Sequence, residues 1–259
     1  MKPGIIDFHI HPWLDAVNNY CFFKDLCPMT PEEGRHRLEQ TGITKACGSV
    51  IGNAAGWADI VHLNDAALQV RERWGDFYIP GFHIHPDYVA QSVAEIRRMA
   101  AQGVRLMGEL VPYIHGWDMG HPGLMPILEA AAEENMIVSF HGTDVTDEMI
   151  EPLLARFPQM PFVAAHPVDK EKMRLHIGRM QRHNNYWLDL SGAGIGRMSL
   201  LPWTVKQVGC EKILFGTDFP ACPPEIYVAA VTRDPMLTEQ EKQAILWDNA
   251  AKLLKRVLS

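Results

Sequence analysis

The chain lacks the sequence features of secreted and membrane-spanning proteins. Asp7, His9 and His11 interrupt the first apolar run, so the N-terminus has no signal-peptide core, and no stretch approaches about 18 uninterrupted apolar residues. The five cysteines are odd in number and scattered, and none forms a Cys-x-x-Cys pair, which argues against a disulfide framework and a zinc ribbon. We therefore expect a soluble, cytoplasmic protein with free thiols and no membrane partner.

Basic stripes and interdomain linkers are also missing. The formal net charge is −7, and acidic and basic residues are intermixed along the 259 residues, so we do not expect nucleic acid as a partner. No low-complexity tract or shift in composition divides the chain, and 47% hydrophobic residues are enough for one large core. The sequence thus predicts one domain over residues 1–259.

Short apolar runs alternate with longer amphipathic segments, a pattern typical of a parallel sheet covered by helices. Strands are predicted at 4–11, 43–51, 77–84, 104–110, 136–141, 161–166, 186–190 and 212–217. Helices are predicted near 31–41, 57–74, 88–102, 122–135, 147–157, 169–183, 199–208, 224–232 and 239–257. Eight strand–helix units in about 250 residues predict an α/β fold of the (β/α)8 TIM-barrel type, with an open doubly wound sheet as the alternative.

Two histidines, His9 and His11, end the first predicted strand. In an extended strand, residues i and i+2 point to the same side, so the two imidazoles can face one point. Imidazole nitrogens are common metal ligands. The pair therefore predicts a buried metal site.

Other predicted strands also end in nitrogen or oxygen donors, and active groups of barrels lie at these C-terminal strand ends. A single strand-end histidine is more often a structural residue. Recurrence at five strand ends favours convergence on one metal. Besides the first pair, the donors are Glu109, His141, His166 and Asp218.

The sequence around these donors resembles the amidohydrolase superfamily, specifically its amidohydrolase-related (amidohydrolase 2) branch of TIM-barrel metal-dependent hydrolases and decarboxylases. The resemblance rests on His9-Ile10-His11, His141, His166, Phe215-Gly216-Thr217-Asp218-Phe219-Pro220 and the tail over 245–254. It implies that His9, His11, His141 and Asp218 bind a divalent metal. It also implies that His166 binds a second metal or polarises the substrate.

Glu109 distinguishes two versions of this site. Its setting, Met107-Gly108-Glu109-Leu110, is similar to the strand-four glutamate of TatD-like hydrolases, which contributes to a two-metal site. A carboxylate can bridge two cations about 3.5–4 Å apart, whereas decarboxylase-like members commonly use one ion. The structural alternative is a salt bridge with Arg105. We therefore expect one or two divalent ions, with zinc favoured by nitrogen-rich ligation and manganese if carboxylates dominate.

A second His-Ile-His motif competes with the first. Phe82-His83-Ile84-His85-Pro86 is identical to Phe8-His9-Ile10-His11-Pro12 and ends the third predicted strand. Spacing alone does not separate the two pairs, but the family resemblance places the metal-binding pair on strand one, next to strand eight in a closed barrel. His83 and His85 are then structural, or His85 contacts the substrate.

The expected reaction is hydrolysis of a small-molecule amide, lactone or ester by a metal-activated water. Asp218 is suited to accept the proton of that water, and His166 to polarise a carbonyl. The alternative is a metal-dependent decarboxylase of an aromatic or unsaturated carboxylic acid. A TatD-like nuclease and a non-catalytic binding protein on a barrel scaffold are less favoured than these two activities.

Substrate contacts are predicted from the loops that follow the strands. Trp13 lies in an aromatic loop with Tyr20, Phe22 and Phe23, and Tyr113 lies in another. Arg197 follows a glycine-rich stretch and could bind a carboxylate or phosphate. The alternative is that these residues only cover the barrel rim. We expect a small-molecule substrate. The sequence is compatible with a homo-oligomer.

Overall fold

The predicted alternation of strands and helices is present in the computed structural model, which describes residues 4–15 and 29–258. Each predicted strand range contains one strand, although β1 ends at Asp7 rather than at residue 11 because only an isolated bridge follows it. The strands are β1 (Ile5–Asp7), β2 (Ile43–Gly48), β3 (Tyr78–Phe82), β4 (Leu106–Leu110), β5 (Ile137–His141), β6 (Phe162–Ala165), β7 (Tyr186–Asp189) and β8 (Ile213–Leu214).

The strands form one parallel sheet in the order β1 to β8. Backbone hydrogen bonds join the two ends of this sheet: Phe8 N–H donates to Phe215 O at 2.8 Å, and His11 N–H donates to Phe219 O at 2.7 Å. The sheet is therefore a (β/α)8 barrel, and the open doubly wound alternative is wrong.

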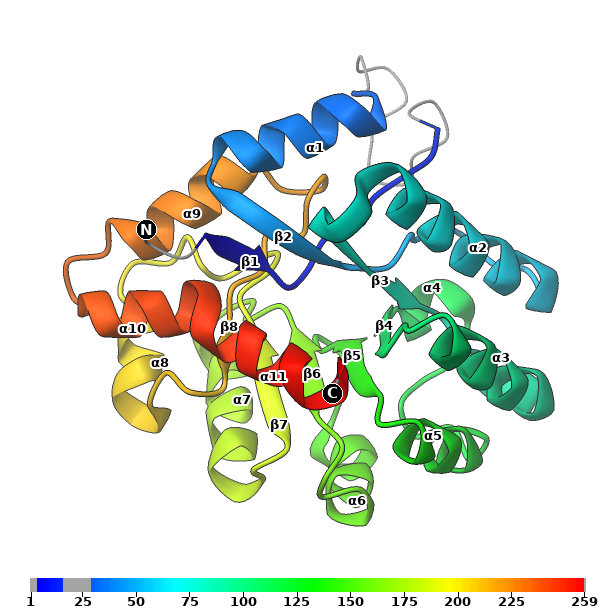
Figure 1. Cartoon of the computed structure of the whole chain (residues 1–259). Coiled ribbons are helices and arrows are strands. Elements are labelled where there is room, and N and C mark those ends of the chain that lie inside the picture. Colours follow the sequence, from blue (N-terminus) through cyan, green and yellow to red (C-terminus); the bar gives the residue numbers. More distant parts are fainter. Residues whose placement is uncertain (1–3, 16–28, 259) are drawn as a thin grey trace.

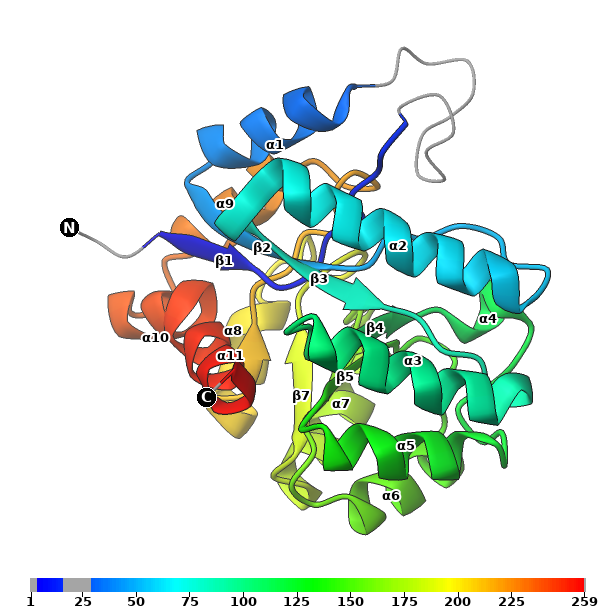
Figure 2. The same cartoon turned by 45° about the vertical axis from the view of Figure 1, so that its right-hand side comes forward.

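The helices surround the strands (Figure 1). Figure 2 shows α1, α2, α3 and α5 following one another around the outside of β1 to β4. The helices are α1 (Pro31–Gln40), α2 (Trp57–Trp74), α3 (Val89–Ala101), α4 (Pro112–His115), α5 (Leu124–Glu133), α6 (Asp147–Arg156), α7 (Lys170–Arg182), α8 (Leu200–Val208), α9 (Pro224–Thr232), α10 (Glu239–Gln243) and α11 (Asn249–Leu258).

Two helical details differ from the prediction. The short helix α4 occupies the loop after β4, where no helix was predicted. The predicted helix over 239–257 consists of α10, a π-helical turn at Ala244–Asp248, and α11. None of the helices in the described part of the chain combines the length and apolar character needed to cross a bilayer.

Side-chain caps fix where several helices begin. At α1, Thr30 accepts a hydrogen bond from the Glu33 backbone, and the Glu33 carboxylate accepts one from the Thr30 backbone, so two free N–H groups are satisfied. Asp169 caps α7 in a related way by accepting from two backbone N–H groups. These local signals explain why the predicted helix starts agree with the structure.

The core closes one end of the barrel and leaves the other for polar groups. Near the strand starts, Ile6, Leu106 and Ile137 pack with Leu253 and Ala250 of α11 in one buried cluster. Burying a leucine fully contributes about 1.5–3 kcal/mol. The C-terminal helix therefore plugs the end of the barrel opposite the predicted site.

The described cysteines carry free thiols, as predicted: Cys47, Cys210 and Cys222. Cys21 and Cys27, and the predicted rim aromatics Tyr20, Phe22 and Phe23, lie outside the described residues.

Candidate metal centre

The segment that carries His9 and His11 is held between β2 and the end of β8. Ile10 N–H donates to Cys47 O at 2.9 Å, and Asp218 N–H donates to His9 O at 2.9 Å. Gly48 has a φ of +152°, and a Cβ there would lie 1.9 Å from Ile10 O. A glycine is therefore required at this close approach, which places the segment at the C-terminal mouth of the barrel.

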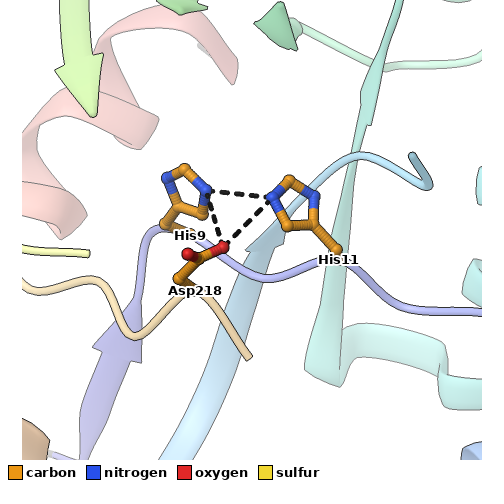
Figure 3. A group of neighbouring side chains, drawn as sticks. All are labelled: His9, His11 and Asp218. Carbon is orange, nitrogen blue, oxygen red and sulfur yellow. Dashed lines mark hydrogen bonds and ion pairs between the residues drawn. The ribbon is translucent and has the colours of Figure 1, made fainter. Parts of the chain in front are cut away.

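His9, His11 and Asp218 converge on one point (Figure 3). The two Nε2 atoms are 3.1 Å apart, and Asp218 Oδ1 lies 3.7 Å from that of His9 and 3.4 Å from that of His11. Ligand atoms bound at about 2.1 Å in a tetrahedral site lie about 3.4 Å from one another. The spacing of the three atoms therefore fits a divalent metal ion.

The tautomers of the two histidines also fit a metal. His11 Nδ1–H donates to Ser49 O at 2.9 Å, and His9 Nδ1 lies 3.0 Å from Asp189 Oδ2. A carbonyl or carboxylate oxygen accepts these hydrogen bonds, so the hydrogen of a neutral ring resides on Nδ1. Both Nε2 lone pairs are then free for the ion, as in other histidine metal sites.

Glu109 lies between two pairs of histidines. Its Oε2 is 3.4 Å from His9 Nε2 and 3.3 Å from His11 Nε2. Its Oε1 is 3.3 Å from His141 Nδ1 and 3.3 Å from His166 Nε2. The structure therefore brings all six predicted donors into one cluster, with the glutamate at its centre.

The predicted alternative for Glu109 does not form. Arg105 instead donates to Ala100 O at 2.7 Å and to Val104 O at 3.1 Å. Glu109 is 3% exposed, and its ion-pair partners among the described residues are all histidines.

Mutual attraction shifts the pKa values of these groups in opposite directions. Burial alone would raise the pKa of Glu109 and Asp218, but the neighbouring imidazoles outweigh it and lower both. Burial alone would lower the pKa of His9, His11 and His166, but the carboxylates raise all three, that of His11 to about 9. The metal-free centre therefore holds carboxylates balanced by protons, which a divalent cation can replace.

Asp7 and Thr217 hold the segments that carry His9 and Asp218, a role that the sequence did not indicate. Asp7 Oδ1 accepts from His9 N–H at 3.1 Å and from Thr217 N–H at 3.0 Å, and its Oδ2 accepts from the Thr217 hydroxyl at 2.6 Å. Burial raises the pKa of Asp7 to about 7, although the hydrogen bonds from Thr217 oppose this shift. The pair ties the end of β1 to the segment that carries Asp218.

Asp189 and Ser191 were missed as well. Asp189 ends β7 and contacts His9, so the same strand-end rule that predicted Glu109 could have identified it. The Ser191 hydroxyl lies 3.1 Å from His9 Nδ1 and 3.2 Å from His166 Nδ1. No sequence signal indicated this serine. It lies in the loop after β7, where the sequence suggested a role only for the glycines and Arg197.

The second His-Ile-His motif is not part of the cluster. His83 Nε2–H donates to Val50 O at 2.9 Å, and burial, with the nearby His115, lowers the pKa of His83 to about 3. His85 Nε2–H donates to His115 O at 3.0 Å, and its Nδ1 accepts from Asp87 N–H. Within the described ranges, neither belongs to a group of potential metal ligands. The structure thus separates two motifs that are identical in sequence.

The other predicted substrate contacts occupy different surroundings. Trp13 is buried, donates to Met29 O and lies beside Phe219, whereas Tyr113 is 59% exposed with its ring 4.6 Å from that of His141. A cavity of about 70 Å³ lies next to Tyr113 and His141. The exposed Arg197 donates to Val168 O at 3.3 Å. Tyr113 is the one of these three that borders the metal-ligand cluster.

Comparison with known proteins gives a family and several similar folds. A family model described as amidohydrolase matches residues 6–256. No curated protein matches the chain with significant similarity. An uncharacterized TIM-barrel protein from Bordetella bronchiseptica has 18% sequence identity and a TM-score of 0.75, over 98% of this chain and 99% of that one.

Several of the similar solved structures are decarboxylases. A 2,6-dihydroxybenzoate decarboxylase in complex with 2,6-dihydroxybenzoate shares 13% identity, with a TM-score of 0.76 over 99% of both chains. A dihydroxybenzoic acid decarboxylase from Polaromonas sp. JS666, with bound manganese and 2-nitroresorcinol, shares 14% identity, with a TM-score of 0.70 over 97% of both chains. At these identities, the likeness establishes the fold.

Proposed function

The chain belongs to the amidohydrolase family, and we propose that it is a metal-dependent hydrolase of a small-molecule amide, lactone or ester. The observation that carries the proposal is the spacing of His9 Nε2, His11 Nε2 and Asp218 Oδ1, which are 3.1–3.7 Å apart. Two neutral imidazoles and a carboxylate are a typical donor set of catalytic zinc sites.

These three residues would hold the ion, and Glu109 Oε2 lies 3.3–3.4 Å from the same two Nε2 atoms. When bound, a divalent ion lowers the pKa of a water molecule and polarises a carbonyl oxygen. Zinc is favoured by the nitrogen donors, and the two carboxylates make manganese the alternative.

Asp218 is placed to act as the general base and then as the general acid. Its side chain is 17% exposed, whereas Glu109 is 3% exposed, so Asp218 is the carboxylate that incoming water reaches. Its carboxylate is ionised at neutral pH and can accept a proton from the attacking water. It can then deliver that proton to the leaving nitrogen or oxygen.

His166 is placed to stabilise negative charge on the substrate. Its Nε2 faces the cluster 3.3 Å from Glu109 Oε1, and its pKa is raised by that carboxylate against the effect of burial. A ring that carries a hydrogen on Nε2 can donate it to a developing oxyanion.

Decarboxylation of an aromatic carboxylic acid is the second candidate. It is favoured by the decarboxylases of similar fold, several of which contain manganese. In that reaction Asp218 or His166 would supply a proton to the carbon that loses carbon dioxide.

A panel of lactones, aryl esters and amides, together with 2,6-dihydroxybenzoate, separates the two reactions. The zinc- and manganese-loaded proteins are assayed for acid release and for carbon dioxide. We expect acid release without carbon dioxide, lost in Asp218→Asn and retained in a control with the exposed His36→Gln. Carbon dioxide release from the dihydroxybenzoate alone would refute hydrolysis in favour of decarboxylation.

A further inference from the structure

A buried hydroxyl connects two histidines of the candidate metal centre. Ser191 is fully buried, and its Oγ lies 3.1 Å from His9 Nδ1 and 3.2 Å from His166 Nδ1. Its backbone N–H donates to Asp189 Oδ1 at 2.9 Å, which fixes the position of the residue. The serine is therefore held between two rings, each of which faces the cluster with its other nitrogen.

The hydrogen on His9 is determined by its partners. If His9 binds the ion through Nε2, as the proposed function requires, its neutral ring carries the hydrogen on Nδ1. That hydrogen points to Asp189 Oδ2 at 3.0 Å, with Ser191 Oγ next to it at 3.1 Å. Toward His9, the serine oxygen can therefore only accept.

The hydroxyl hydrogen of Ser191 must then be donated to an acceptor other than His9. In the described part of the chain, the other contact of Oγ is Nδ1 of His166. Because a buried hydroxyl without an acceptor is costly, the hydrogen goes to Nδ1, which must offer its lone pair. The neutral His166 ring then carries its hydrogen on Nε2, where Glu109 Oε1 accepts it at 3.3 Å.

The opposite arrangement satisfies fewer groups. Were His166 to bind a second ion through Nε2, its Nδ1 would carry the hydrogen and donate to Ser191 Oγ. Two ring N–H groups would then face one serine oxygen, and the serine hydrogen would have no acceptor among the described residues.

We propose that Ser191 is a positioning residue that fixes His166 as the tautomer with its hydrogen on Nε2. This inference rests on the proposed function, because it uses His9 as a metal ligand. It assigns His166 a hydrogen-bond donor role toward the substrate instead of metal ligation. It also predicts one ion, on the side of Glu109 that faces His9 and His11.

Nitrogen NMR of the zinc-loaded protein, labelled with ¹⁵N-histidine, tests the proposal. Zinc is diamagnetic, so protonated, lone-pair and metal-bound ring nitrogens can be distinguished. The His166 signals are those lost in His166→Gln. We expect a protonated Nε2 and a lone-pair Nδ1 for His166. In Ser191→Ala, the Nδ1 resonance should move because it loses its hydrogen bond, and the population of this tautomer should fall.

Zinc affinity provides a second measurement. Ser191→Ala should bind zinc as the wild type does, because Asp189 still orients His9. Asp189→Asn should bind zinc about 10- to 100-fold more weakly. Thr204→Val, which removes a buried hydroxyl that bonds to Leu200 O in α8, is the matched control and should change neither measurement.

The role of Ser191 and the proposed function would fail in different ways. A metal-bound Nε2 on His166 in the wild type, or a His166 spectrum unchanged by Ser191→Ala, would overturn the role of the serine. A wild type that binds no zinc would instead refute the proposed function, and with it the premise that His9 carries its hydrogen on Nδ1.

Discussion

Metal binding should release protons, because the metal-free centre holds protons where the ion belongs. A histidine must be neutral to bind a metal through its free nitrogen. The pKa of His11 is about 9, since Asp218 and Glu109 raise it more than burial lowers it. The pKa of His9 lies well above its ordinary value, because Asp189 and Glu109 raise it more than burial lowers it. At pH 7 the two rings, whose Nε2 atoms are 3.1 Å apart, therefore hold at least one extra proton in the metal-free protein.

The pKa of His11 sets the size of the pH effect on zinc affinity. Removing its proton at pH 7 costs about 2 pKa units, or about 3 kcal/mol. Raising the pH from about 7 to about 9 should therefore increase apparent zinc affinity about tenfold per pH unit from His11 alone, and more steeply with His9. The effect disappears above the pKa of both groups.

Calorimetry in buffers of different protonation enthalpy measures this directly. The slope of the observed binding enthalpy against the buffer enthalpy gives the number of protons released. We expect between one and two at pH 7, and the same number in the exposed His36→Gln control. A slope of zero would mean that His9 and His11 are already neutral, and would refute the electrostatic description of the metal-free centre.

Three further predictions follow from the structure. His9→Ala and Asp218→Ala should lose bound metal in elemental analysis, whereas His83→Gln should keep it, because His83 lies outside the cluster. Acid should destabilise the fold through His83 and His176, whose pKa values burial lowers to about 3 from 6.5. Stability from each is complete above about pH 6.5 and falls by about 2 kcal/mol at pH 5, so His176→Gln should show a shallower loss in urea titrations. Arg179→Met should lose about 3 kcal/mol in the same titrations, because Arg179 is 1% exposed and bonds to two buried oxygens, the Tyr186 hydroxyl and Val145 O.

The sequence was sufficient to predict the barrel and most of the donors because both follow from local patterns. Strands buried on both sides appear as short apolar runs, as at β4, where all five residues are buried. Glu109 and His141 lie in the last two residues of their strands, and His166 directly follows its own. Once the barrel is assumed, the rule for strand ends brings these residues together.

The supporting residues could not be predicted in the same way. Ser49 acts through its backbone carbonyl, which any residue supplies, and Ser191 acts because a loop returns it between two rings. His83 illustrates the limit most clearly. Its motif matches that of His9 letter for letter, but His83 follows β3 and bonds to Val50 O, whereas His9 follows β1 and lies beside Asp218.

The candidate metal centre lies at the seam where the barrel closes, and this explains why its residues are so far apart in sequence. β8 is a two-residue strand, and most of its connection to β1 is made beyond its end, by the segment that carries Asp218. Asp7 and Thr217, 210 residues apart, form a buried hydrogen bond across this seam. Closing a loop of that length costs conformational entropy before any contact is gained. An ion bound by His9, His11 and Asp218 would join the two sides of the seam, so the residues suited to catalysis also complete the fold.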